Sequence, residues 1–191
     1  MSKGRLEAFS DGVLAIIITI MVLELRPPAG PGLTALQSKI PGIVSYILSF
    51  VFLGIYWNNH HHLFQAAQKV NGAVLWANLH LLFWLSLIPF ATAWMGQDGF
   101  VLGPVALYCF LQLMAAMAYF LLVRALLTHH GKDSLLAKAI GRDFKGKISI
   151  VLYLVALPLA FILPALALSL LVLVAVMWLI PDRRIEGVLD R

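Results

Sequence analysis

Polar and ionisable side chains gather at the start of the first apolar segment, where a simple membrane anchor would carry Leu and Val. The group consists of Arg5, Glu7, Ser10 and Asp11, and thus of one cation, two carboxylates and one hydroxyl. Such groups are costly in hydrocarbon unless they are paired. Two interpretations are open at this point. Ser10 and Asp11 either cap a helix at the membrane interface or bond to polar groups of other helices inside the protein.

A second polar group lies at residues 58–62, where two asparagines precede three adjacent histidines. Consecutive helical positions point about 100° apart, so at most two of His60, His61 and His62 converge. No Asp, Glu or Cys neighbours them, which argues against a zinc site. We expect one of these histidines and Asn59 to bond Ser10 and Asp11, together with Asn78 or His80 of the next apolar segment. A proton relay is the alternative, since His titrates near neutral pH.

The elements that position these residues must be membrane helices. Of the 191 residues 61% are hydrophobic and 12% are charged, and the mean hydropathy is +0.91, which excludes an ordinary water-soluble domain. A bilayer core of about 30 Å needs about 20 apolar residues in a helix. We therefore predict an all-α, polytopic membrane protein with one transmembrane domain over residues 1–191. Its six expected spans are 6–25, 41–63, 72–94, 101–127, 148–163 and 165–180.

The basic residues decide between six spans and five, because the break at Leu163 and Pro164 would also fit a kink in one long helix. Lys and Arg accumulate in cytoplasmic loops. With six spans, 12 of the 14 Lys and Arg lie on the same side as both termini, and only Arg26 and Lys39 lie opposite. We expect both termini to be cytoplasmic. The charges are divided among short breaks, which does not favour nucleic acid as a partner, and the single Cys109 allows no intrachain disulfide.

An apolar stripe follows the polar start of the first segment. At 100° per residue, Ile16, Thr19, Ile20 and Leu23 fall within one sector of the helix, and Asp11 lies on the other side. The helix is therefore expected to present an apolar ladder to one partner and polar groups to a second. The alternative is that the stripe faces lipid.

Three motifs carry a resemblance to a known family. They are Arg5-x-x-x-Phe9-Ser10-Asp11, continuing to Thr19; Trp57-x-Asn59-His60-His61; and the run at residues 75–79 that leads to Pro89 and Phe90. These motifs resemble the first three helices of the prokaryotic transmembrane-protein-175 potassium channels. The last three predicted helices are similar to that family only in hydropathy and number.

The resemblance implies a homotetramer whose first helices line a central ion pathway narrowed by apolar rings. It places the constriction at Ile16, further rings at Ile20 and Leu23, and a hydroxyl layer at Thr19. The implied structural network that ties the first helix to the second and third consists of Arg5, Ser10, Asp11, Asn59, His60, His61 and Asn78. No Thr-Val-Gly-Tyr-Gly sequence occurs, so a backbone-carbonyl filter has no visible source.

We therefore expect a potassium channel in the plasma membrane of a prokaryote, with potassium as the permeant ion. Its other expected contacts are lipid and monovalent cations. We expect no cofactor, no metal site and no enzymatic activity. Isoleucines cannot coordinate an ion, so the constriction is expected to act by dewetting and by the cost of ion dehydration. The main alternative is a proton-coupled transporter that uses Asp11 and His60 to His62. A metalloenzyme would need further ligands, and His129 and His130 lie in a distant loop. A structural subunit without conduction is the remaining alternative.

Overall fold

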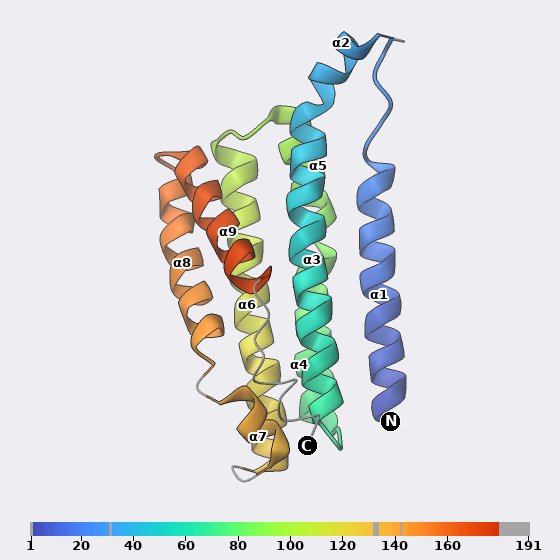
Figure 1. Ribbon diagram of the computed structural model, residues 1–191, viewed down its shortest axis with the longest axis vertical. Coiled ribbons are helices and arrows are strands. Elements are labelled where there is room, and N and C mark those ends of the chain that lie inside the picture. Colours follow the sequence, from blue (N-terminus) through green and yellow to red (C-terminus); the bar gives the residue numbers. More distant parts are fainter. Residues whose placement is uncertain (1, 31, 132–133, 142, 180–191) are drawn as a thin grey trace.

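The computed structural model describes residues 2–30, 32–131, 134–141 and 143–179. All regular structure in these ranges is helical, as predicted (Figure 1). The order is α1 (Lys3–Leu23), α2 (Leu33–Leu36), a 3-10 turn η1 (Gln37–Lys39), α3 (Ile40–Ala66), α4 (Gly72–Ser86), α5 (Ile88–Asp98), α6 (Leu102–His130), α7 (Leu135–Ile140), α8 (Phe144–Ala160) and α9 (Pro164–Leu179).

Four helical segments of the described chain are long and apolar enough to cross a membrane. They are Lys3–Leu23, Leu33–Ala66, Gly72–Asp98 and Leu102–His130. The helices α8 and α9 are shorter, at 17 and 16 residues. They pack side by side and run in opposite directions (Figure 1). The chain therefore reverses between Ala160 and Pro164, and the alternative of one kinked helix is wrong.

The third predicted span is interrupted, whereas the sequence analysis treated it as one helix. α4 ends at Ser86 and α5 begins at Ile88. Pro89 explains the interruption, because proline has no backbone N–H and its ring clashes with the preceding turn of a helix. Thr92, one turn further on, donates its hydroxyl hydrogen to the carbonyl of Ile88 at 2.8 Å.

The bundle places α1 at one edge and the α8–α9 pair at the other, with α3 and α6 between them (Figure 1). α1 packs on α3, α4 and α5, whereas α8 and α9 pack on α6 and on each other. Small residues allow close helix contacts of the kind found in membranes. At the crossing of α3 and α5, a Cβ atom on Gly96 would lie only 2.9 Å from the Cα atom of Gly42.

Candidate ion-conduction site

The inner face of α1 is a regular stripe that packs on the bundle. Its buried residues follow helical spacing and are Leu6, Ser10, Leu14, Ile17 and Met21. Ser10 is the only polar residue of this stripe. A buried hydroxyl needs a partner, which Ser10 can find on its own helix or on the helices opposite.

Both α1 itself and the opposite helix α4 supply a partner. Asn78 of α4 donates its Nδ2 hydrogen to Ser10 Oγ at 2.9 Å, and Ser10 donates its own hydrogen to the carbonyl of Leu6 at 2.9 Å. The amide of Asn78 thus turns its Oδ1 atom toward His60 Nε2 of α3, 2.8 Å away. An amide oxygen only accepts, so His60 carries its hydrogen on Nε2. A directed chain of hydrogen bonds runs from α3 through α4 to α1.

This chain is fully enclosed by protein. Ser10, His60 and Asn78 are all buried, and the His60 ring lies 4.5 Å from the ring of Phe64. Inside a protein, a satisfied polar network fixes the relative position of its helices, because each broken bond would leave a desolvated polar group. The network therefore holds α1 in one rotational setting.

Asp11 lies outside this network and uses a different partner. The indole Nε1 of Trp57 donates to Asp11 Oδ1 at 3.0 Å. The Trp57 ring also stacks on His61, with ring centres 6.0 Å apart. The interpretation of Ser10 and Asp11 as helix caps is wrong, since α1 begins at Lys3, before both residues.

The outer face of α1 carries the stripe expected at the conduction path. Ile16, Ile20 and Leu23 are 60%, 44% and 73% exposed, and Thr19 is exposed between them. The hydroxyl hydrogen of Thr19 goes to the carbonyl of Ala15 at 2.7 Å. The oxygen of Thr19 remains an acceptor on this face. The four residues thus form a continuous, mostly apolar surface opposite to the side fixed by Ser10.

Comparison with known proteins identifies the family. The family model for the endosomal/lysosomal potassium channel TMEM175 matches residues 5–89. A potassium channel of Chryseobacterium sp. (strain P1-3) is 55% identical over 186 residues, which cover 97% of each chain. The chain belongs to the TMEM175 family.

More distant TMEM175 relatives match a smaller part of the chain. A potassium channel of Streptomyces collinus is 39% identical over 99 residues, about half of each protein. The human endosomal/lysosomal proton channel TMEM175 is 32% identical over 103 residues, or 48% of this chain and 20% of the human protein.

A solved structure, described as a lysosomal potassium-selective channel TMEM175 homolog from Chamaesiphon minutus, superposes with a TM-score of 0.79. It is 29% identical and covers 93% of this chain and 96% of its own.

Not every residue expected in the TMEM175 network takes part in it. The side-chain Nδ2 of Asn59 donates to the carbonyl of Ile55 at 2.7 Å, and the backbone carbonyl of Asn59 accepts from the hydroxyl of Tyr119 of α6 at 3.2 Å. Arg5 forms no hydrogen bond or ion pair with any residue that the structure describes. His80 accepts from Trp84 at 2.8 Å instead of bonding to α1. Asn59 therefore joins α3 to α6, away from α1.

The sequence analysis missed a further buried polar cluster in this TMEM175 chain. Ser49 Oγ of α3 lies 2.7 Å from Thr92 Oγ1 of α5 and donates to the hydroxyl of Tyr108 of α6 at 3.0 Å. These residues are spaced far apart and belong to no motif, so only the packing brings them together. Within the described residues, no three His, Cys, Asp or Glu side chains come close enough to hold a metal ion.

Proposed function

We propose that four copies of this chain surround a central pathway lined by the exposed face of α1, and that potassium passes along this face. The chain is a potassium channel of the TMEM175 family, and the proposal concerns where and how it conducts. The observation that carries it is the division of α1 into two faces. One face is fixed by the buried bond between Ser10 and Asn78, and the other presents Ile16, Thr19, Ile20 and Leu23.

Several copies are needed because one α1 cannot enclose a pathway. Cyclic closure turns each exposed side chain into a ring. Each subunit is proposed to be one domain of six crossing helices with both termini in the cytoplasm, in the plasma membrane of a prokaryote.

A helix of 16 or 17 residues, as α9 and α8 are, spans about 25 Å. α8 and α9 therefore cross with the help of flanking residues or of a locally thinner bilayer.

The rings act on the ion in different ways. The ring of Ile16 offers no oxygen atom, so an ion passes it only after shedding water, and potassium sheds water more readily than sodium. Thr19 lies one turn further along α1 and offers an acceptor oxygen that replaces part of the lost hydration. Glu24 is exposed at the C-terminal end of α1, where its carboxylate adds to the negative end of the helix dipole and concentrates cations.

The buried network has a structural role in this proposal. A rotation of α1 by one residue, or about 100°, would move Ile16 off the pathway. Ser10, Asn78 and His60 prevent this rotation because it would separate hydrogen-bonded groups in a water-free environment. No cofactor is needed, and the contacts of the assembled channel are lipid and monovalent cations.

Ion flux into liposomes tests the proposal. Purified protein is reconstituted with a potassium gradient, a proton-sensitive dye and valinomycin as the reference, and the assay is repeated with sodium. Potassium flux is expected, and Ile16→Asn is expected to raise sodium flux relative to potassium flux. Val22→Asn is the matched control, because Val22 is 46% exposed on the same helix but points away from the stripe.

Two results would contradict the proposal. Unchanged relative permeabilities in Ile16→Asn would remove this residue from the constriction. Proton movement in a fixed ratio to potassium would instead support the coupled transporter. Among the described residues Asp11 bonds to Trp57 and His60 bonds to Asn78, so no direct hydrogen bond links the two residues of the proposed relay.

A further inference from the structure

The exposed stripe of α1 continues from Ile16 toward the N-terminal end of the helix. At 100° per residue, Gly12 and Phe9 lie about 40° and 20° from Ile16, inside the sector that the stripe occupies. Both residues are exposed, Phe9 at 51%. α1 is one uninterrupted helix from Lys3 to Leu23. Phe9 and Gly12 therefore share the face of Ile16.

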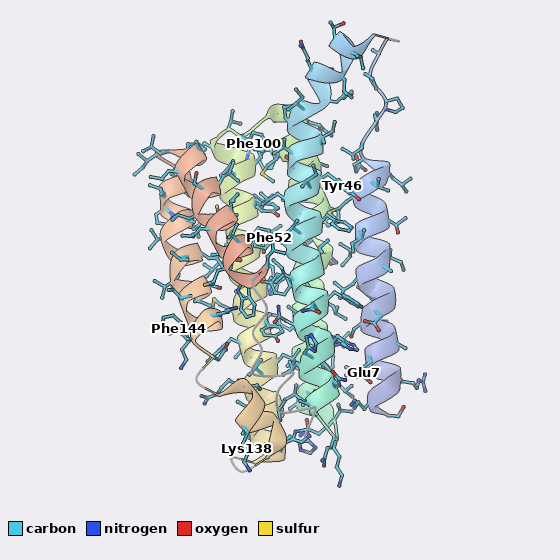
Figure 2. The ribbon with its side chains drawn as sticks, in the orientation of Figure 1. Glu7, Tyr46, Phe52, Phe100, Lys138 and Phe144 are labelled. Atoms are coloured by element: carbon cyan, nitrogen blue, oxygen red, sulfur yellow. The ribbon has the colours of Figure 1, made fainter. Side chains whose placement is uncertain are left out.

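Phe9 is the last apolar side chain of the stripe in this direction. The next residue in the same sector is Arg5, which is exposed and charged. Glu7, labelled in Figure 2, lies at this same end of α1. Phe9 therefore stands where the apolar face of the helix meets charged groups and water.

Gly12 leaves a gap in the stripe between Phe9 and Ile16. These two side chains are seven residues apart, or about 10 Å along the helix axis, and between them only Gly12 falls in the sector of the stripe. A Cβ atom on Gly12 would meet nothing within 4 Å, so no contact within the subunit requires glycine at this position. Glycine inside a helix lowers stability relative to alanine. Its effect here is to remove side-chain bulk from the exposed face.

In the assembly proposed above, this gap becomes a chamber. Cyclic closure turns Phe9 and Ile16 into two rings, and Gly12 into a wider wall between them. A cation that sheds water at Ile16 must first reach this ring with its water shell, and the glycine wall leaves room for that shell. The aromatic rings of Phe9 also attract cations through their quadrupole.

We propose that Phe9 and Gly12 form an inner vestibule of the conduction path, and that this vestibule binds a hydrated potassium ion beside the ring of Ile16. The vestibule lies on the side of Ile16 that faces the N-terminal end of α1. The Phe9 side chains narrow its mouth, and Gly12 gives it width. This inference rests on the function proposed for α1 and adds two residues to the pathway.

The reactivity of Gly12→Cys tests the vestibule in planar bilayers that contain the full chain. Cys109 is buried, so the unsubstituted channel provides the background. A cationic, membrane-impermeant thiosulfonate reagent is applied to each side of the bilayer in turn. It should block the current of Gly12→Cys from one side only. High potassium should slow this block relative to the same concentration of N-methylglucamine, because the bound ion occupies the space beside Gly12.

Gly4→Cys is the matched control for this reaction. Gly4 is an exposed glycine of the same helix, and its Cβ position is equally free of neighbours. It lies about 120° from Ile16, outside the stripe. Modification of Gly4→Cys should therefore leave the current unchanged.

The role of Phe9 is tested by a second substitution in the Gly12→Cys channel. Phe9→Ala widens the mouth of the vestibule and should speed the block, whereas Phe9→Leu keeps most of the apolar bulk and should speed it less. Val22→Ala is the control, because Val22 is exposed on α1 but points away from the stripe. If Gly12→Cys carries no current, Phe9→Cys replaces it in the potassium experiment.

Three results would overturn the inference. They are a current that the reagent does not block, a block that potassium does not slow, and a rate of block that Phe9→Ala leaves unchanged. The channel proposal is judged separately, because Ile16→Asn should alter the ratio of sodium to potassium flux whatever happens at Gly12. If Ile16→Asn also has no effect, both proposals fail.

Discussion

Asn78 Nδ2 donates to Ser10 Oγ at 2.9 Å, and both side chains are almost completely buried. This bond connects the third membrane segment to the helix that carries the exposed stripe. Ser10→Ala should leave the Asn78 donor without a partner and reduce the free energy of unfolding by about 1–3 kcal/mol. Thermal unfolding and the yield of the assembled oligomer in detergent measure this loss.

A surface serine provides the control for Ser10→Ala. Ser86 is exposed, and among the described residues its hydroxyl bonds only to the carbonyl of Phe83 in its own helix. Ser86→Ala should change the free energy of unfolding by less than about 0.5 kcal/mol. Equal effects of the two substitutions would show that the bond to Asn78 adds nothing to stability.

The contact between Trp57 and Asp11 depends on an acceptor oxygen and not on charge alone. Asp11→Asn keeps an oxygen atom for the indole hydrogen, whereas Asp11→Ala removes it. We expect the oligomer yield to fall in Asp11→Ala and to be largely retained in Asp11→Asn. Size-exclusion chromatography after identical extraction compares the oligomer yields of the two variants. A loss of equal size in both variants would instead indicate a requirement for the negative charge.

Thr19 separates the role of a hydroxyl from that of side-chain size. Thr19→Val removes the acceptor oxygen with little change in shape, and Thr19→Ser keeps it. If the hydroxyl replaces water around the ion, Thr19→Val should lower the ratio of potassium to sodium flux, and Thr19→Ser should retain that ratio. Ion-replacement measurements on liposomes give the ratio of potassium to sodium flux directly. An unaltered ratio in Thr19→Val would leave Ile16 as the sole selective ring.

The crossing of α3 and α5 should tolerate no side chain at Gly96. A methyl group there would meet the backbone of Gly42 at 2.9 Å, so Gly96→Ala should force the helices apart and cost about 1–3 kcal/mol. Gly54 of α3 is the matched control, because nothing lies within 4 Å of its Cβ position. Gly54→Ala should be neutral or slightly stabilising. Thermal unfolding of both variants distinguishes overpacking from a general intolerance of helical glycine replacement.

The sequence predicted the helical class and the family, because apolar length and the first-helix motif are local signals. Helical spacing also predicted the shared face of Ile16 and Leu23. The hydrogen-bond partners of the buried polar residues were harder to predict. Asn59 was expected to bond Ser10 or Asp11, but its side-chain amide donates to the carbonyl of Ile55 and its backbone carbonyl accepts from Tyr119 of α6. Such choices depend on the rotation of each helix in the bundle, which a single sequence does not specify.

Other differences from the sequence analysis arose from single residues. Trp57 was identified only as part of a motif, although an indole N–H near membrane depth needs an acceptor and Asp11 was available. The break before Ile88 was missed, although Pro89 was visible in the sequence. In both cases the chemistry of the residue was a usable signal, and the length of the surrounding apolar run concealed it.

The separation of α1 from the α8–α9 pair coincides with the range that the family model matches. The matched range of the family model, residues 5–89, ends just after α5 begins and contains all but the first two residues of α1, together with the bonds that orient it. α8 and α9 pack on the far side of α6. Neither helix supplies a partner to the hydrogen bonds of Ser10 with Leu6 and Asn78. The bonds that orient α1 therefore form entirely within the matched range, and the α8–α9 pair lies outside that range.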